Sequence, residues 1–195
     1  MLSDRDLSRR RFLRRMLGAG MGLLSLEFVG GTLAFTWPNL TEGIGSVVRV
    51  GTLDEIHVAE PGFARGYPYQ VNAVRSFLVN VPAAKALAAG EPTEVRQPAA
   101  SDLLALWRTC PHLGCMVPAL CESTKRFECL CHGSTYNILG EKLEKGPASR
   151  GMDRFAVEFD ADGTLVIDTR EVIRGAPEGT VTFRDPHPAA EGCAG

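Results

Sequence analysis

The sequence lacks several features that mark common classes of protein. Its 195 residues contain no low-complexity tract and no internal repeat, and the formal net charge at pH 7 is only −2. Histidine is scarce, with four residues in the chain. The absence of biased or repeated segments, together with 45% hydrophobic residues, favours a folded and non-repetitive protein. The length allows one ordinary domain plus an appendage.

The small net charge conceals an asymmetry along the chain. Residues 1–36 contain six arginines and three acidic residues, whereas residues 37–195 contain fifteen basic and twenty acidic residues. Because the larger part is mildly acidic, the sequence argues against nucleic acid as a partner. A basic N-terminus and an acidic body suit a chain whose N-terminus stays at the cytoplasmic face of a membrane.

Basic residues near the N-terminus precede a long apolar run. Residues 8–13 read S-R-R-R-F-L and are followed by Arg14 and Arg15, a pattern that resembles the twin-arginine export signal. A plain basic cap on a membrane helix is the alternative, since basic residues gather on the cytoplasmic side in any case. We therefore expect residues 1–15 to be a cytoplasmic twin-arginine segment.

The apolar run that follows has the length of a membrane span. Residues 16–37 number twenty-two, enough to cross roughly 30 Å of hydrocarbon. Trp37 suits an interface, Pro38 stops the helix, and no A-x-A cleavage pattern follows. Glu27 would cost about 2.5–3.5 kcal/mol at mid-membrane unless it faced another helix. We expect a retained transmembrane anchor over residues 16–37 and a flexible hinge linker over residues 38–46.

The remainder reads as short strands. Apolar or alternating stretches are bounded by turn residues, and the Asp160-Ala161-Asp162-Gly163 break is a hairpin signal. Only Ala83–Ala89 looks helical. We therefore expect a mainly β chain in which an antiparallel β domain over residues 47–195 follows the N-terminal helix. The predicted strands are Val47–Val50, Phe77–Val81, Leu103–Trp107, Phe155–Phe159, Thr164–Asp168 and Val181–Phe183.

The stretch from Arg108 to Arg150 breaks this rhythm, because it is rich in Cys, Gly and Pro. Four of the six cysteines form two tight pairs there, and two of the four histidines lie inside the pairs. Such spacing indicates a metal centre, disulfides or both, and a metal centre could hold a loop-rich insertion together. The two motifs are Cys110-Pro111-His112-Leu113-Gly114-Cys115 and Cys129-Leu130-Cys131-His132-Gly133-Ser134.

Read as C-x-H-x-G-C and C-x-C-H-G-S, these motifs resemble the Rieske family, specifically the iron–sulfur subunits of cytochrome bc and bf complexes. The resemblance is close over residues 107–151, where it implies a loop-rich cluster-binding subdomain of a Rieske domain. It implies one [2Fe–2S] cluster, with Cys110 and Cys129 as thiolate ligands of one iron and His112 and His132 as imidazole ligands of the other. It also implies a disulfide between Cys115 and Cys131.

The same resemblance suggests roles for residues around the cluster. Leu113 matches a residue that screens the cluster from water. Ser134 and Tyr136 match hydroxyls that donate hydrogen bonds to a bridging sulfide and to a ligand sulfur. Gly146-Pro147-Ala148 matches a loop that covers the far side of the cluster. Ser149 stands where the family string G-P-A-P has its last proline, so this loop is expected to be slightly less rigid.

The ligand set has consequences for electron transfer. Two neutral imidazoles in place of two thiolates remove negative charge, which raises the potential from about −400 mV to roughly −150 to +300 mV. Hydroxyl donors to sulfur raise it further. Reduction also makes the distant N–H of an iron-bound imidazole less acidic, so an electron and a proton can be taken together. The resemblance points to His132 as the residue that contacts quinol and accepts its proton.

These features together imply an electron-transfer subunit of a respiratory or photosynthetic quinol–cytochrome c reductase. A cytochrome b-type subunit, a c-type cytochrome and quinol would be its partners. The expected location is the cytoplasmic (bacterial inner) membrane, crossed once, with the head domain on the periplasmic side.

Three alternatives compete with parts of this interpretation. A structural zinc site uses similar ligands, but it leaves Cys115, Cys131, Ser134 and Tyr136 unexplained. The Rieske small subunit of an arsenite-oxidase-like molybdoenzyme resembles this chain in its twin-arginine export, although the anchor, the linker and the extra cysteine pair favour the cytochrome complex. Cys121 and Cys193 could pair, but a free thiol or unrelated roles are the favoured interpretation.

Overall fold

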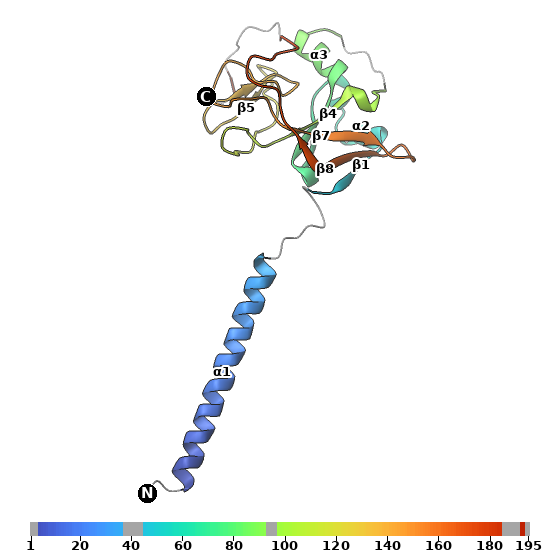
Figure 1. Cartoon of the computed structure of the whole chain (residues 1–195). Helices are drawn as coiled ribbons and strands as arrows, with labels where there is room; N and C mark the ends of the chain where they lie inside the picture. The colour runs from blue at the N-terminus through green and yellow to red at the C-terminus, as the bar shows by residue number, and fades with distance from the viewer. Residues whose placement is uncertain (1–3, 37–44, 93–96, 185–191, 194–195) are drawn as a thin grey trace. The chain divides into compact units, whose positions relative to one another are not determined.

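The computed structural model describes residues 4–36, 45–92, 97–184 and 192–193, and the chain divides into two compact units (Figure 1). One unit contains the N-terminal helix and the other contains the β domain. Antiparallel strands follow a long apolar helix, so the mainly β fold class expected from the sequence is confirmed.

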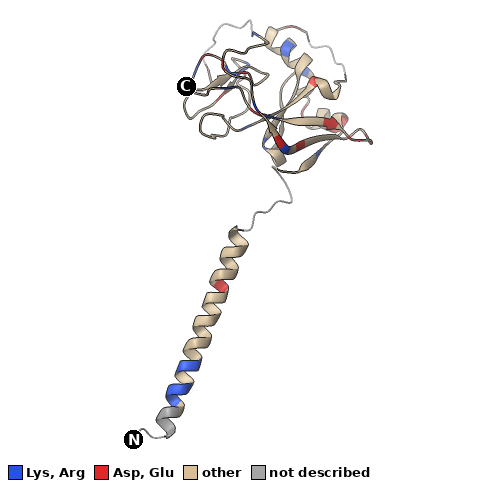
Figure 2. Ribbon diagram, in the orientation of Figure 1, with Lys and Arg blue, Asp and Glu red and all other residues tan. Residues whose placement is uncertain are grey.

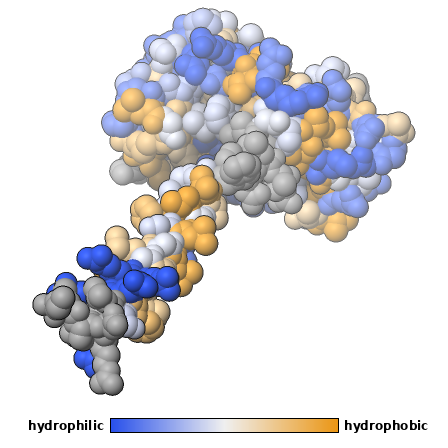
Figure 3. Space-filling view, turned by 60° about the horizontal axis from the view of Figure 1, so that its bottom comes forward, coloured by the Kyte–Doolittle hydropathy of each residue, from blue (hydrophilic) through white to orange (hydrophobic). Residues whose placement is uncertain are grey.

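The N-terminal unit is a single helix, α1 (Asp4–Thr36). No proline interrupts it, and the hydroxyls of Ser25 and Thr36 donate to the backbone carbonyls of Met21 and Thr32 at 2.8 and 2.7 Å. Its arginines gather near the N-terminal end (Figure 2), and apolar side chains follow them along the helix (Figure 3). Residues 8–36 are long and apolar enough to cross a membrane. Trp37, the last residue of the expected anchor, lies outside the described residues.

The β domain is built on a six-stranded antiparallel sheet with the strand order β1-β8-β7-β4-β3-β2. Strands β4 and β7 are neighbours in this sheet although the whole cysteine-rich stretch separates them along the chain. That stretch therefore leaves and re-enters the sheet at adjacent positions. The strands are β1 (Val47–Gly51), β2 (Tyr69–Val71), β3 (Ser76–Asn80), β4 (Leu103–Trp107), β7 (Arg154–Phe159) and β8 (Leu165–Ile173).

Both faces of the sheet are covered at its centre, because every residue of β3 is buried. On β3, Leu78 points into a core shared with helix α2 (Leu53–Ala59) and the 3-10 helix η1 (Phe63–Arg65). Its neighbours Phe77 and Val79 point into a second core, shared with helix α3 (Val81–Ala89) and the cysteine-rich stretch. Each fully buried side chain of this size contributes about 1.5–3 kcal/mol. The cysteine-rich stretch is therefore packed on one face of a rigid sheet.

Several local predictions need correction. Helix α2 was not expected, although Thr52 and Glu55 form a capping box that the sequence displays. Val181–Phe183 was expected to be a strand, but it is irregular because its backbone bonds to side chains of another segment. Three short strands were missed: β2, and the two-stranded sheet of β5 (Phe127–Glu128) and β6 (Thr135–Tyr136). The hairpin at residues 160–163 joins β7 to β8 as expected.

The expected hinge over residues 38–46 is only partly described. Gly45 and Ser46 donate backbone hydrogen bonds to the Thr169 hydroxyl on β8 at 2.9 and 3.0 Å. Ser46 is further bound through its carbonyl, which accepts from the Thr169 backbone at 2.8 Å. These two residues therefore belong to the β domain, and residues 38–44 lie outside the described residues.

The capping box of α2 gives a stability prediction. Thr52→Ala should lower the free energy of unfolding of the β domain by about 1 kcal/mol, because the Glu55 amide loses its side-chain acceptor. Chemical denaturation of the detergent-solubilised chain measures this. Thr180→Ala, at an exposed threonine, is the control and should change stability by less than about 0.5 kcal/mol. Equal effects of both substitutions would contradict the capping role.

Candidate metal centre

The two cysteine–histidine motifs fold into two loops of the same backbone form. In the first, the Cys110 amide donates to the Cys115 carbonyl at 2.8 Å, and the Gly114 amide donates to the Cys110 carbonyl at 3.0 Å. In the second, Cys129 and Gly133 make the corresponding bonds, to the Ser134 and Cys129 carbonyls, at 2.9 and 3.0 Å. Both glycines have a positive φ, which closes each loop where other residues would be strained.

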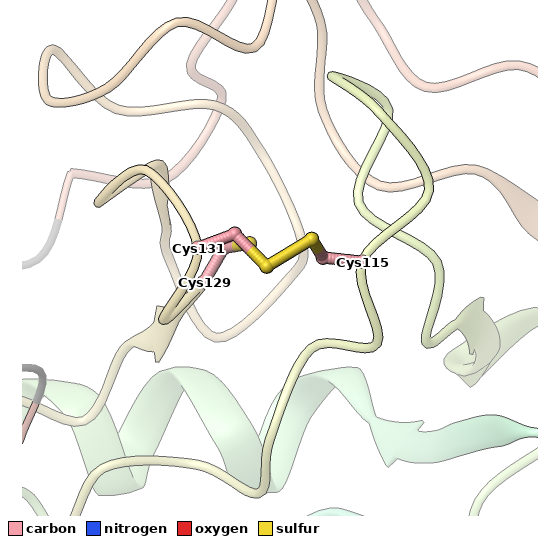
Figure 4. A group of neighbouring side chains, drawn as sticks. All are labelled: Cys115, Cys129 and Cys131. Carbon is pink, nitrogen blue, oxygen red and sulfur yellow. A yellow bond between two sulfur atoms is a disulfide. The ribbon is translucent and has the colours of Figure 1, made fainter.

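A disulfide joins the two loops. Cys115 of the first loop is bonded to Cys131 of the second, across a sequence separation of 16 residues. Figure 4 shows this bond with the Cys129 sulfur beside it, and the three sulfur atoms lie within 4.8 Å of one another. Because two of the three are bonded to each other, only Cys129 of this group is available to a metal.

The predicted ligands sit at the inner and outer ends of these loops. Cys110 and Cys129 are free thiols that are almost completely buried. The rings of His112 and His132 meet edge to face with their centroids 4.8 Å apart. His112 is half-buried and His132 is exposed. Each of the two loops thus carries one buried thiol and one of two imidazoles that contact each other.

These residues fit an iron–sulfur group on three observations. The Nδ1 atom of His112 is buried and has no hydrogen-bond partner among the described residues, which is costly unless something else binds it. Burial raises the pKa of the Cys129 thiol, and the neighbouring Cys110 thiol raises it further. Two buried thiols that form no disulfide are available to a metal, which would bind them as thiolates. Buried sulfur paired with imidazole nitrogen is the donor set of an iron–sulfur or zinc centre.

Comparison with known proteins decides between these two groups. Residues 69–156 match the family profile of the Rieske [2Fe-2S] domain. This chain contains a Rieske domain. Its cofactor is accordingly a [2Fe–2S] cluster, as the sequence motifs implied. The zinc alternative is set aside.

Relatives of the Rieske domain come from two kinds of complex. The chloroplastic cytochrome b6-f complex iron-sulfur subunit of Volvox carteri is 40% identical over 60 residues, which cover 31% of this chain and 28% of that protein. The corresponding Chlamydomonas reinhardtii protein is 28% identical over 177 residues, covering 84% and 75%. The mitochondrial cytochrome b-c1 complex subunit Rieske of Saccharomyces cerevisiae is 40% identical over 57 residues, covering 29% and 26%. The Volvox and yeast matches thus span less than a third of those relatives.

Two hydroxyls lie next to the proposed ligands of the Rieske domain. The Tyr136 hydroxyl is 3.1 Å from the Cys110 sulfur, as the sequence resemblance implied. Burial raises the pKa of Tyr136, and the contact with Cys110 raises it further. Ser134 is also buried, and its hydroxyl accepts a hydrogen bond from the Ala148 amide at 3.1 Å. The Ser134 side chain also forms a hydrogen bond with the Tyr136 hydroxyl, which works to lower the pKa of Tyr136.

The loop with Gly146 and Pro147 packs against the second cysteine loop. A Cβ atom built on Gly146 would lie 2.2 Å from the Ser134 Cα and 2.6 Å from the Gly133 carbonyl carbon, and Gly146 has a φ of +84°. Only glycine permits this backbone conformation together with such close contact. The backbone conformation of this loop therefore depends on Gly146. The side chains of Pro147 and Ser149 are exposed.

The tip of the Rieske domain exposes apolar side chains. Leu113 and Leu130, at matching ends of the two loops, are 73% and 66% exposed, and Met116 beside them is 64% exposed. Exposed apolar residues beside an exposed histidine indicate a surface that meets a partner or a small apolar molecule. Leu113 was expected to screen the cluster from water, and it lies at this surface.

Three residues that the motifs did not identify pack beside the first loop: Arg108, Phe77 and Phe127. The Arg108 guanidinium lies over the Phe77 ring at 4.8 Å, and Phe77 stacks on Phe127 with centroids 4.8 Å apart. Arg108 also donates from Nε to the Val117 carbonyl at 3.3 Å. This stack links β3 of the sheet to the residues that lie two positions before each motif, Arg108 before Cys110 and Phe127 before Cys129. An arginine two residues before a motif cysteine was the only sequence signal for it.

A second disulfide corrects the expectation for the remaining cysteines. Cys121 and Cys193, for which separate roles were favoured, are bonded to each other across 72 residues. Their long separation in sequence gave no spacing signal, since pairing depends on where the chain end returns. The bond attaches the C-terminal end to the segment between the two loops.

The close packing at Gly146 yields a prediction for the Rieske domain. Gly146→Ala should prevent normal packing of residues 146–148 on Ser134, and the protein should carry less iron. Iron content and the reduced-state electron paramagnetic resonance signal measure the loss. Gly163→Ala is the control, because Gly163 also has a positive φ but has open space around it. An unchanged cluster in Gly146→Ala would contradict the packing argument.

Proposed function

We propose that this chain is the Rieske subunit of a membrane-bound quinol–cytochrome c reductase. In this role it takes one electron, together with a proton, from quinol and passes the electron to a c-type cytochrome. The observation that carries the proposal is the exposed His132 on a loop that a disulfide fixes to its partner loop, surrounded by apolar side chains.

Two further observations support it. The relatives named above are subunits of cytochrome b6-f and b-c1 complexes. The α1 helix suits a single membrane anchor, with the arginines near its start on the cytoplasmic side and the Rieske domain on the other side. The twin-arginine signal would export the domain already folded with its cluster, and it stays a prediction.

The ligand roles belong to the same proposal. Cys110 and Cys129 would hold one iron, and His112 and His132 the other. When bound, the cluster supplies one-electron transfer at a potential of roughly −150 to +300 mV. The chain's own residues determine access: Cys110 and Cys129 are buried away from water, whereas the exposed His132 offers its outer ring nitrogen to a quinol hydroxyl and holds the transferred proton there.

The remaining residues would tune and orient this site. Tyr136 donates its proton toward the Cys110 sulfur, which stabilises the extra negative charge of the reduced state. The disulfide holds Leu113 and Leu130 in fixed positions around the histidines. An apolar rim of this kind favours the entry of a quinol head group over water.

Tyr136→Phe should lower the midpoint potential while the cluster stays bound. A hydrogen bond that is about 1–1.5 kcal/mol stronger in the reduced state corresponds to a fall of about 40–60 mV for one electron. A redox titration followed by electron paramagnetic resonance measures the shift. Tyr69→Phe, at a half-buried tyrosine on β2, is the control and should leave the potential unchanged. A potential in Tyr136→Phe equal to wild type would show that this hydroxyl does not act on the cluster.

Leu130→Arg should sharply reduce quinol-dependent reduction of a c-type cytochrome in membranes that contain the protein. A charge on the apolar rim disfavours quinol entry, whereas iron content and potential should stay close to wild type. Val58→Arg makes the same change at a residue of α2 that is 82% exposed, and it should leave turnover unchanged.

The same membranes also test the identity of the complex. The purified complex should contain b-type haem. Molybdenum in its place would favour the molybdoenzyme alternative, and normal turnover in Leu130→Arg would contradict a quinol site at this rim.

A further inference from the structure

The described residues after β8 are 174–184 and 192–193, and we call them the C-terminal segment. Its first part runs along the cysteine-rich stretch. The Gly151 amide donates to the Ala176 carbonyl at 2.8 Å, and the Glu178 amide donates to the Ser149 carbonyl at 3.1 Å. Contact is close enough that a Cβ atom on Gly175 would lie 2.2 Å from the Gly151 carbonyl oxygen. Residues 175–178 are therefore bound to the backbone that follows the Gly146–Ala148 loop.

Farther along, one carboxylate binds the same segment. Glu141 accepts hydrogen bonds from the backbone amides of Thr182 at 3.1 Å and Phe183 at 3.3 Å, and from the Thr182 hydroxyl. It also accepts from the Asn137 side-chain amide at 2.7 Å. Burial works against its ionisation, but the bonds from Thr182 and Asn137 prevail and hold the pKa of Glu141 below its usual range. Glu141 is thus a charged acceptor surrounded by donors.

Asn137 completes this connection and lies directly after Tyr136. It is fully buried, and its side-chain amide also donates to the Phe183 carbonyl at 2.9 Å. Its side-chain oxygen accepts from the amides of Leu139 and Glu141 at 3.0 and 2.9 Å. The turn after β6 and the C-terminal segment therefore share one hydrogen-bond network.

This network ends on the strand that carries Tyr136. The Asn137 amide donates to the Glu141 carbonyl at 3.0 Å, and the Leu143 amide donates to the Thr135 carbonyl at 3.0 Å. Tyr136 itself pairs with Lys142. Residues 141–145 thus form the second arm of a hairpin whose first arm directs the Tyr136 hydroxyl at the Cys110 sulfur.

The Cys121–Cys193 disulfide fixes the segment a second time. Gly192 lies against the buried Glu128, since a Cβ atom on Gly192 would be 2.7 Å from the Glu128 carboxylate. Glu128 immediately precedes Cys129. The described parts of the C-terminal segment therefore contact Glu128, directly before Cys129, and Asn137, directly after Tyr136.

We propose that Glu141 is a positioning residue for the cluster: by binding the backbone of Thr182 and Phe183, it fixes the hairpin that directs the Tyr136 hydroxyl at Cys110. The consequence is a higher midpoint potential and slower loss of the cluster. The inference rests on the proposed ligand role of Cys110, and it is independent of the electron donor and acceptor.

Glu141→Gln tests this with little change of shape. Glutamine places an amide donor among the donors of Asn137, Thr182 and Phe183, so the network loses acceptors. The midpoint potential should fall, as is also expected for Tyr136→Phe. Loss of iron to a chelator should become about tenfold faster, which corresponds to about 1.4 kcal/mol. Glu144→Gln removes the same charge from an exposed residue of the same hairpin and should change neither quantity.

A Cys121→Ser, Cys193→Ser double variant tests the segment without altering Glu141. It should accelerate cluster loss, and hydrogen exchange at residues 135–145 should increase in the holoprotein. The same exchange increase is expected in Glu141→Gln, and this readout does not depend on turnover.

The outcomes separate the possible failures. Wild-type potential in Glu141→Gln overturns the positioning role, even if the cluster is lost faster, because a merely stabilising contact would leave the potential unchanged. An equal fall in Glu144→Gln overturns it too, since net charge would then be the cause. Wild-type protein that binds no iron would instead refute the proposed ligand site, and a normal cluster without quinol-dependent turnover would refute only the proposed function.

Discussion

The Cys115–Cys131 disulfide is the constraint on which the site depends. The two loops that it joins have little regular secondary structure, and they lie in a long insertion between the neighbouring strands β4 and β7. Restricting a loop of this length in the unfolded chain is worth about 3 kcal/mol in the chain-entropy model. More important for function, the bond fixes the distance between two loops that each contain one proposed cysteine ligand and one proposed histidine ligand.

The rest of the β domain holds those two loops in place. Because β4 and β7 are adjacent, the insertion begins and ends at neighbouring strands of the sheet. The core that includes Leu53, Phe63 and Leu78 covers the opposite face of this sheet. Arg108, Phe77 and Phe127 form a stack beside the first loop. The C-terminal segment binds Glu141 in the hairpin that contains Tyr136. The Cys121–Cys193 bond, with its longer separation, adds about 4 kcal/mol in the same entropic model. The exposed tip can therefore remain apolar and still keep its shape.

The parts of this architecture that local sequence determines were predictable. Alternation of apolar residues predicted five of the strands within a few residues, and the hairpin at Asp160–Gly163 followed from its turn residues. The motif spacing predicted the loops and, through the family resemblance, the cluster. Helix α2 could have been recognised from Thr52 and Glu55. The partners of Glu141 and Cys193 could not, because both depend on the path of the C-terminal segment over residues far away in sequence. Val181–Phe183 shows the same effect. Its alternating apolar and polar residues predicted a strand, but its backbone binds the side chains of Glu141 and Asn137 and pairs with no strand of the described residues.

The most direct test of a cluster held by two cysteines and two histidines is electron paramagnetic resonance of the reduced protein containing isotope-labelled histidine. Hyperfine spectroscopy would detect nitrogen nuclei bound to iron. The predicted result is a spectrum with two coupled histidine nitrogens per cluster. His112→Ala should fail to retain the cluster and should therefore give no cluster signal. A reduced cluster whose spectrum shows no histidine nitrogen coupling would contradict the assignment of His112 and His132 as ligands.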